Sequence, residues 1–256
     1  MLSQTKDSHA QDSLISPLHT SLFNLLVLDA PYTERYVRCG ERTGANHPLL
    51  LDAINGKRVD TMHMKKGEAS RAKLVACAAE LFWRQGYNAT GLSEILQAAS
   101  LPKGSFYFYF EGKRDLAAAV IEYYRRIVSD DMKQLAEGRD WHAFVHTLTR
   151  KHLSSAAEGE HNGCPFAVMG MELALSEPEI AGLYAAALDE ARQIMAEVLE
   201  RSGLNHEDAK SLSSLELTIF EGKLMLFRIS SEAAHLETME REMIQVYEQW
   251  EARHAH

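Results

Sequence analysis

The chain has 256 residues, and its 46% hydrophobic content is enough for one or two packed domains. A formal net charge of −9 argues against a protein that binds nucleic acid over its whole surface. Three cysteines, Cys39, Cys77 and Cys164, are an odd number without metal-ligand spacing, which favours a reducing cytosol over a disulfide framework.

Residues 1–64 differ from the rest of the chain. They contain turn-forming residues, sustain no helical period, and hold six basic against seven acidic residues. We expect a poorly ordered extension with at most a short helix over 19–28. Residues 1–61 are either a genuine arm or sequence upstream of the true start, because Met62 and Met64 precede the first strong helix. The apolar run 22–28 is too short to cross a membrane and lacks the flanks of a secretory signal, so we expect a soluble, cytoplasmic protein.

From residue 67 onward the hydrophobic pattern is helical. Leu74, Ala78 and Phe82 belong to the apolar stripe of a first helix that Gly86 is expected to end. A capping box is expected at 176–179, and Asn205 is expected to cap the next long helix. No alternating strand pattern competes, so the predicted fold is all-α. Further helices are expected at about 91–98, 102–109, 113–136, 140–157, 164–175, 177–202, 207–231 and 235–252.

Residues 90–110 have the pattern of a helix-turn-helix. Thr90 is expected to cap a short helix whose Ile95 and Leu96 face inward. After a tight connection over 99–101, Pro102 suits the first turn of a second helix. The second helix of such a motif is the one that enters a major groove of DNA.

The second helix carries groups suited to DNA. Lys103 and Ser105 lie at its start, where a phosphate is favoured, and Gly104 allows close approach to a base edge. The aromatic cluster that follows could be simple core, which is the interpretation we favour for Phe106 and Phe110. The aromatic residues of this cluster cannot all face inward on one helix, so Tyr107, Tyr109 and Lys113 are expected to contact DNA.

Charge is unevenly distributed in a way that suits contact with DNA at one end. Residues 65–115 hold eight basic and five acidic residues, whereas residues 116–256 hold 13 basic and 24 acidic residues. Phosphate neutralisation supplies most non-specific affinity for DNA, so a basic module on an acidic body is the expected arrangement. Ordinary variation in surface charge is the alternative.

Residues 68–116 resemble the DNA-binding region of the TetR family, down to the run Pro102-Lys-Gly-Ser-Phe-Tyr-x-Tyr-Phe-x-x-Lys113-x-x-Leu116. The resemblance implies a helix-turn-helix DNA-binding domain at 65–112, then a helical effector-binding and dimerisation domain at 113–256. Many members have His at the position of Tyr109, so this chain departs from the family at that phosphate contact. The resemblance implies DNA contacts at Thr90, Ser93, Lys103, Gly104, Ser105, Tyr107, Tyr109 and Lys113.

Two heptad-like apolar stripes occupy the last helices. One runs from Leu212 to Ile229 and the other from Leu236 to Trp250. We expect residues 207–252 to form a four-helix interface in a homodimer, as the family resemblance also implies. The alternative is that one stripe packs internally.

Methionine and aromatic side chains in the body suggest a pocket for an apolar effector, although each also suits an ordinary core. Cys164 lies at a predicted helix start, where the helix dipole lowers the pKa of a thiol. It resembles the Gly-Cys at the start of the sixth helix in a TetR subfamily, some members of which sense electrophiles or oxidants while others bury the cysteine. The candidate effector residues are Cys164, Phe166, Trp141, Met169 and Tyr184.

The sequence therefore predicts a repressor that binds a palindromic operator in double-stranded DNA as a homodimer and responds to a small molecule or electrophile. The alternative is an architectural DNA-binding protein without an effector. No enzyme is expected, because no catalytic motif is present. His142 and His146 are spaced as metal ligands, but a third ligand is not apparent, so neither a metal nor a cofactor is expected.

Overall fold

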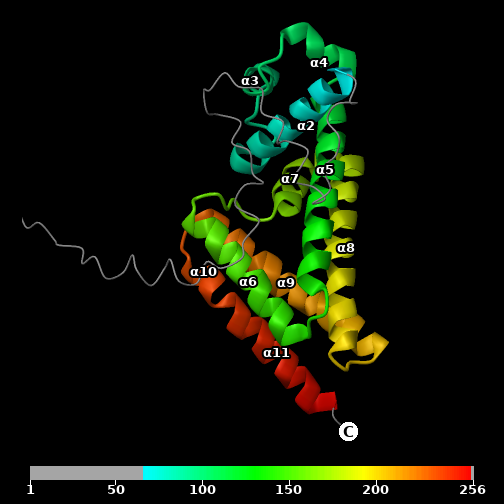
Figure 1. Ribbon diagram of the computed structural model, residues 1–256, viewed down its shortest axis with the longest axis vertical. Coiled ribbons are helices and arrows are strands. Elements are labelled where there is room, and N and C mark those ends of the chain that lie inside the picture. Colours follow the sequence, from blue (N-terminus) through cyan, green and yellow to red (C-terminus); the bar gives the residue numbers. More distant parts are fainter. Residues whose placement is uncertain (1–65, 255–256) are drawn as a thin grey trace, which may run out of the picture. The chain divides into compact units, whose positions relative to one another are not determined.

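The computed structural model describes residues 66–254. The predicted extension at 1–64, with its short helix at 19–28, lies outside the described residues. Within them the chain is helical and has no strand, which confirms the all-α prediction (Figure 1). In chain order the helices are α2 (Lys66–Gln85), α3 (Leu92–Ala98), α4 (Lys103–Tyr109), α5 (Lys113–Ala136), α6 (Trp141–Ala157), α7 (Pro165–Leu173), α8 (Pro178–Arg201), α9 (His206–Ser230), α10 (Ala234–Glu237) and α11 (Met239–His254).

Helices α2, α3 and α4 form a small unit that we call the head. Its core contains Leu74, Phe82, Ile95 and Phe106, none of which is exposed, so apolar residues from all three helices hold the head together. Gly86 follows α2 with a φ of +92° and donates its amide to the Phe82 carbonyl at 2.9 Å, as expected of a residue that ends a helix.

The start of α3 differs from the prediction. Gly91, not Thr90, is the N-cap residue, and no side chain caps this helix. Thr90 lies one residue earlier with its hydroxyl group bonded to the carbonyl oxygen of Gly86 at 2.7 Å. The same hydroxyl group accepts a hydrogen bond from the Gln85 side chain at 3.3 Å, so it links the end of α2 to the following turn and does not cap α3.

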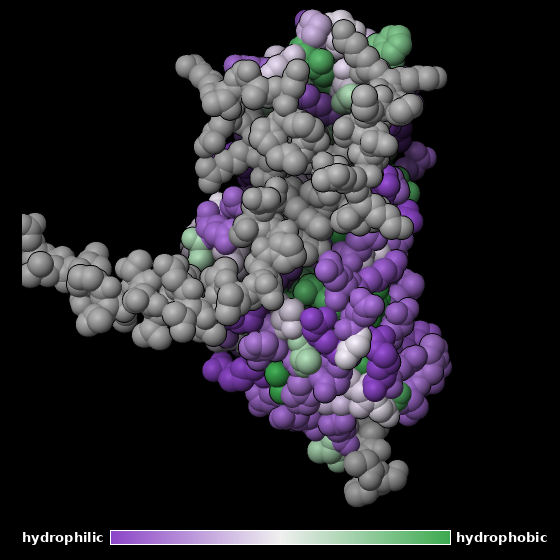
Figure 2. All heavy atoms as spheres, in the orientation of Figure 1, coloured by the Kyte–Doolittle hydropathy of each residue, from purple (hydrophilic) through white to green (hydrophobic). Residues whose placement is uncertain are grey.

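Helices α5 to α11 form the body. Helix α5 contacts both α2 and α8, so it joins the head to the body, and α8 packs against α5, α7 and α9 (Figure 1). Tyr124 on α5 donates its hydroxyl group to the Ala79 carbonyl of α2 at 2.7 Å. On the face shown in Figure 2, the body carries mainly hydrophilic side chains with scattered hydrophobic ones. No helix among the described residues is long and apolar enough to cross a membrane.

One predicted helix cap is confirmed and another is wrong. Asn205 accepts a hydrogen bond from the Asp208 amide at 3.0 Å, as expected of an N-cap. The capping box at 176–179 does not form, because α8 begins after Glu177, whose amide already bonds the Leu173 carbonyl. Glu177 and Glu179 both pair with Arg114 of α5 instead.

The last predicted helix is divided at Thr238 into α10 and α11. Leu236, Met239 and Met243, which begin its apolar stripe, have no exposed surface within one protomer. That part of the stripe therefore packs internally, which was the alternative interpretation, and the same residues cannot also form a dimer surface.

Candidate DNA-binding surface and effector site

Helix α4 presents one face to solvent and buries the other. Phe106 is fully buried in the head core, whereas Lys103 and Gly104 are exposed and Tyr107 retains 62% of its surface. A side chain added at Gly104 would meet nothing within 4 Å, so the backbone is open to an approaching ligand at this point. The exposed face of α4 therefore carries an amine, a bare stretch of backbone and a phenol.

Phe108 is a surface residue that the sequence interpretation missed. It retains 80% of its surface, although the motif treats its position as variable. Residues three and four apart share a helix face, so the spacing of Gly104, Tyr107 and Phe108 was the signal that could have identified it. An exposed aromatic ring on this face can contact sugars or a thymine methyl group.

The other residues of the head that were predicted to contact DNA differ in how far they are exposed. Ser93 of α3 is exposed and Ser105 is half-buried. Tyr109 was expected to point outward but is half-buried, with its ring edge-to-face against Phe108 at 4.9 Å and its hydroxyl group facing Gly67. Thr90 is 1% exposed, so its side chain lies within the head and not on the surface.

Lys113, another predicted DNA contact, lies over aromatic rings of the head. Its ammonium nitrogen is 4.2 Å from the centre of the Tyr87 ring and 5.8 Å from that of Phe82. Burial lowers its pKa, and the negative charge of Glu172 acts in the opposite direction. Lys113 therefore stabilises the end of α2 through cation–π contacts.

Four of the five predicted effector residues come together around α7. Cys164 is the N-cap of α7, Phe166 and Met169 lie on it, and Tyr184 of α8 has its ring 6.4 Å from that of Phe166. All four are buried. Trp141 is buried elsewhere, at the start of α6, where it packs against Phe144 and Tyr247, so the structure does not bring it to this group.

The prediction of an activated thiol at Cys164 is wrong. Burial raises the pKa of this thiol well above its ordinary value, and the carboxyl group of Glu221 raises it further. The amides at the start of α7 do lower it, as the helix position implies, but they are the weaker influence. The sequence could not show this, because Glu221 reaches the thiol from α9, 57 residues further along the chain.

A pair of histidines that the sequence interpretation missed lies beside this site. His152 Nδ1 and His161 Nε2 are 2.8 Å apart, and the Gly163 amide donates to His161 Nδ1 at 3.1 Å. Burial lowers the pKa of His161 to about 4 and also lowers that of His152, so both rings are neutral at pH 7. His161 therefore carries its proton on Nε2 and donates it to His152.

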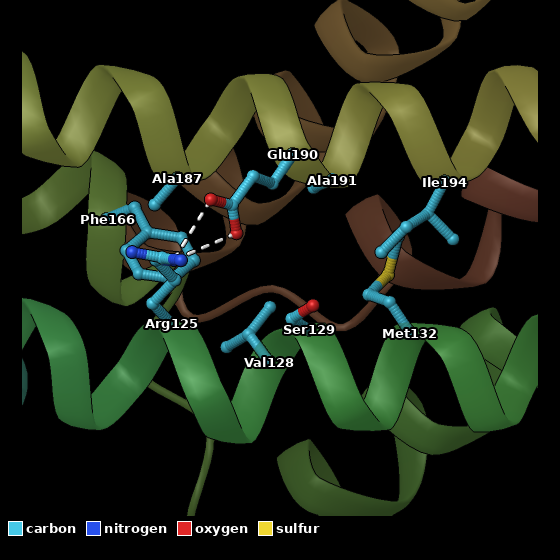
Figure 3. Close-up of a pocket in the computed structure, with 9 residues that line it drawn as sticks. All are labelled: Arg125, Val128, Ser129, Met132, Phe166, Ala187, Glu190, Ala191 and Ile194. Carbon is cyan, nitrogen blue, oxygen red and sulfur yellow. Dashed lines mark hydrogen bonds and ion pairs between the residues drawn. The ribbon is translucent and has the colours of Figure 1, made fainter.

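A narrow cleft lies between α5 and α8, and Phe166 reaches it from α7 (Figure 3). Arg125 and Glu190 form an ion pair across it, with 2.9 Å between Nε and Oε1. The cleft has a volume of about 10 Å³, which is room for roughly one water molecule. In this conformation the cleft is too small to hold an organic effector.

Three side chains connect the body to the end of α2. Arg228 of α9 donates to the carbonyl of Trp83 at 2.7 Å and also to that of Asn162, in the loop before Cys164. The Trp83 indole donates in turn to the Gly163 carbonyl at 2.8 Å. Glu172 of α7 accepts a hydrogen bond from the backbone amide of Asn88 at 2.8 Å. The loop that carries Cys164 is thus bonded directly to the head.

His142 and His146 do not face each other as metal ligands. His146 Nδ1 lies 2.9 Å from Glu240 and His142 Nε2 lies 3.6 Å from Glu248, both glutamates being on α11. Each histidine therefore interacts with its own carboxylate, and these contacts hold α6 against α11.

Two family models match separate parts of the chain. Residues 74–120 match the bacterial regulatory proteins of the tetR family, and residues 141–242 match the C-terminal domain of LmrA/YxaF-like transcriptional regulators. The HTH-type transcriptional regulator YxaF of Bacillus subtilis is 31% identical over 160 residues, which cover 61% of this chain and 84% of that protein. LmrA of the same organism is 29% identical over 163 residues, which cover 61% of this chain and 85% of LmrA.

Solved structures give the same result. A TetR transcriptional regulator from Chloroflexus aurantiacus superimposes with a TM-score of 0.63 and 27% identity, over 73% of this chain and 98% of that one. The reduced form of Escherichia coli NemR, at 19% identity, shares the fold with a TM-score of 0.60 over 69% of this chain and 96% of that one. The chain belongs to the TetR family of helix-turn-helix bacterial transcriptional regulators.

Proposed function

We propose that this protein is a repressor that binds a palindromic DNA operator as a homodimer and leaves it when a small-molecule effector binds the body. The observation that carries the proposal is the exposed face of α4, with Lys103, Gly104, Tyr107 and Phe108 on a helix whose other face is locked into the head core. A rigid helix with an amine and two aromatic rings outward is suited to a major groove.

The homodimer is supported by the outer face of α9. Four apolar residues remain well exposed there, Ile229 most of all at 74%. Exposed apolar side chains that recur along one helix mark a protein–protein interface, and a two-fold axis would pair α9 with its own copy. Two heads would then reach successive half-sites, roughly 34–36 Å apart if one helical turn separates them. The exposed residues are Leu215, Met225, Leu226 and Ile229.

The bonds of Arg228 support communication between effector and DNA. Arg228 lies on α9, near the proposed dimer surface, and holds both the end of α2 and the loop before Cys164. A ligand that moves this loop or α9 changes the position of the head. Such a ligand shifts the DNA-binding equilibrium only by its differential affinity for the two states.

The buried, protonated Cys164 favours a binding effector over an electrophile, because the thiolate is the reactive form and burial disfavours it. The architectural alternative, a DNA-binding protein without an effector, predicts binding that depends on salt but not on sequence. Selection of operator DNA from random sequence by the full chain separates the two, since an architectural protein enriches no palindrome.

The DNA surface is tested by alanine substitution of Lys103 and Tyr107 and gel shift on the selected operator. Lys103→Ala is expected to weaken operator binding and to lower the slope of log affinity against log salt by about one, because one phosphate contact is lost. Tyr107→Ala is expected to weaken binding as well. Lys133→Ala, an exposed lysine of α5, is the matched control. Unchanged operator affinity in both head variants, with unchanged circular dichroism, would contradict the assigned surface.

A further inference from the structure

An unpartnered carboxyl group lies inside the body. Glu216 is on the inward face of α9 and has no exposed surface. Neither of its carboxyl oxygens has a hydrogen-bond partner among the described residues. Folded proteins pair nearly all buried polar atoms, because an unsatisfied one loses its hydration without compensation. A carboxyl group in this position therefore indicates a partner from outside the described chain.

A second unpartnered group lies on the facing helix. The Thr149 side chain of α6 is 1% exposed, and its hydroxyl group also lacks a partner within the described residues. One turn further along, the rings of His152 on α6 and Phe220 on α9 are in contact, with 5.3 Å between their centres. Residues three or four apart share a helix face, so Thr149 and Glu216 both lie on the faces that meet at this contact.

The contacts at the two ends of α6 and α9 show that the helices run in the same direction. At the start, the Trp141 amide donates to Ser202, shortly before α9 begins. At the end, the Asn162 carbonyl after α6 accepts from Arg228, near the last turn of α9. Thr149 and Glu216 are therefore at the same level between the helices, one turn before the contact of His152 with Phe220.

The electrostatic surroundings favour a positively charged partner. Burial alone raises the pKa of Glu216 to about 9, and no basic side chain among the described residues offsets it. Glu221, five residues further along α9, also has a buried carboxyl oxygen without a partner among the described residues, and burial raises its pKa to about 7. Residues 116–256 hold 24 acidic against 13 basic residues, which attracts cations to the body.

We infer that the body binds a hydrophobic organic cation, such as a protonated aromatic amine, with the carboxyl group of Glu216 as its charged acceptor and the Thr149 hydroxyl group beside it. The inference rests on the proposed effector function and names the class of effector. On binding, Glu216 releases its proton to solvent and the carboxylate accepts a hydrogen bond from the ammonium group, so the net charge of the site is unchanged. The aromatic rings of Phe220 and His152 supply the apolar wall on one side.

The test uses the full chain and matched pairs of probes. Benzylamine, 2-naphthylmethylamine and 4-phenylbenzylamine are each compared with the alcohol of the same skeleton by isothermal titration calorimetry at pH 7, in two buffers of different ionisation enthalpy. At least one amine is expected to bind at least ten times more tightly than its alcohol. The dependence of the heat on the buffer should show release of about one proton for each amine bound.

Variants assign the effect to the carboxyl group. Glu216→Gln has the shape of the protonated side chain and is expected to abolish both the preference for amine and the proton release. Thr149→Val should weaken amine binding while leaving the proton release in place. Glu197→Gln, which changes an exposed glutamate of α8, is the control and should behave as the wild type. Melting temperatures verify that each variant is folded.

Three results would overturn the inference. These are equal binding of amines and alcohols, no binding of any of the amines, or a Glu216→Gln variant that keeps the preference and the proton release. A gel shift on the operator is run in parallel. If an amine binds through Glu216 but does not release DNA, the ligand inference stands and its effector role in the proposed function fails. If the chain enriches no operator, the proposed function fails independently of ligand binding.

Discussion

At the scale of single residues, Glu216 makes the stability of the body depend on pH. Its pKa is about 9 in the folded protein against an ordinary value of 4.5. Between these values the unfolded chain has lost a proton that the folded chain retains. The free energy of unfolding therefore falls as pH rises through this range, at most by about 1.4 kcal/mol per pH unit.

Glu216→Gln removes this dependence, because an amide does not ionise. We expect the variant to be more stable than the wild type at pH 8.5 and the difference to shrink toward pH 5. Urea denaturation at pH 5, 7 and 8.5 measures it. All other ionisable groups are the same in both proteins, so the comparison isolates Glu216, and Glu197→Gln should follow the wild type. Parallel stability curves for the wild type and Glu216→Gln would show that Glu216 is ionised in the folded state.

Residue-level predictions from the sequence succeeded where local spacing decides the outcome. The helical period put Phe106 inside and Tyr107 outside, as the structure shows. The residue-level predictions failed where a distant part of the chain contacts the residue in question. The pKa of Cys164 depends on burial and on Glu221, and the side chain of Lys113 is drawn over aromatic rings of α2 and its following turn. Neither partner can be identified from the local sequence.

At the scale of helices, the connection after α2 depends on Gly86. Its φ of +92° suits glycine, and a side chain there would lie 2.1 Å from Oε1 of Glu172. Glu172 would have to move and would lose its bond from the Asn88 amide. Gly138 also has a positive φ, of +66°, but a side chain there would meet nothing within 4 Å. The two glycines therefore separate backbone strain from loss of the contact between head and body.

Alanine substitution at both glycines tests this reasoning. Gly138→Ala should lower the free energy of unfolding by roughly 1–2 kcal/mol through backbone strain. Gly86→Ala should cost about 1 kcal/mol more, since the hydrogen bond to Glu172 is also lost. In a Glu172→Ala background the extra cost at Gly86 should shrink by about the value of the lost hydrogen bond, which a double-mutant cycle by urea denaturation measures. Equal costs with Glu172 present would show that this contact contributes nothing.

Helix positions were largely predictable, and helix ends less so. Apolar periodicity located most of the helical segments, and the local cap at Asn205 is confirmed. The predicted capping box at 176–179 does not form, and Arg114, more than 60 residues away, forms ion pairs with both of its glutamates. The break at Thr238 was not predicted either, since the apolar stripe continues through it while Lys223 of α9 donates to its hydroxyl group.

At the scale of the whole molecule, the proposed dimer makes a definite prediction. Ile229→Glu places two carboxylates near a two-fold axis on an apolar surface, so the dimer should dissociate at least tenfold more readily. Sedimentation velocity should show a shift toward a 28.8 kDa species. Leu175→Glu changes an apolar residue that is 98% exposed between α7 and α8, and it should leave the dimer intact. Unaltered sedimentation of Ile229→Glu would place the interface elsewhere.

Arg228 holds the head through hydrogen bonds to its main chain, and this matters for how such regulators diversify. Every acceptor that it uses in the head is a backbone carbonyl oxygen. Main-chain oxygens are common to all sequences, so substitutions at the end of α2 leave these acceptors in place. A foreign DNA-reading unit could therefore be grafted onto this body without redesign of that link. Operator specificity could then change during evolution while the proposed response to an effector is inherited unchanged.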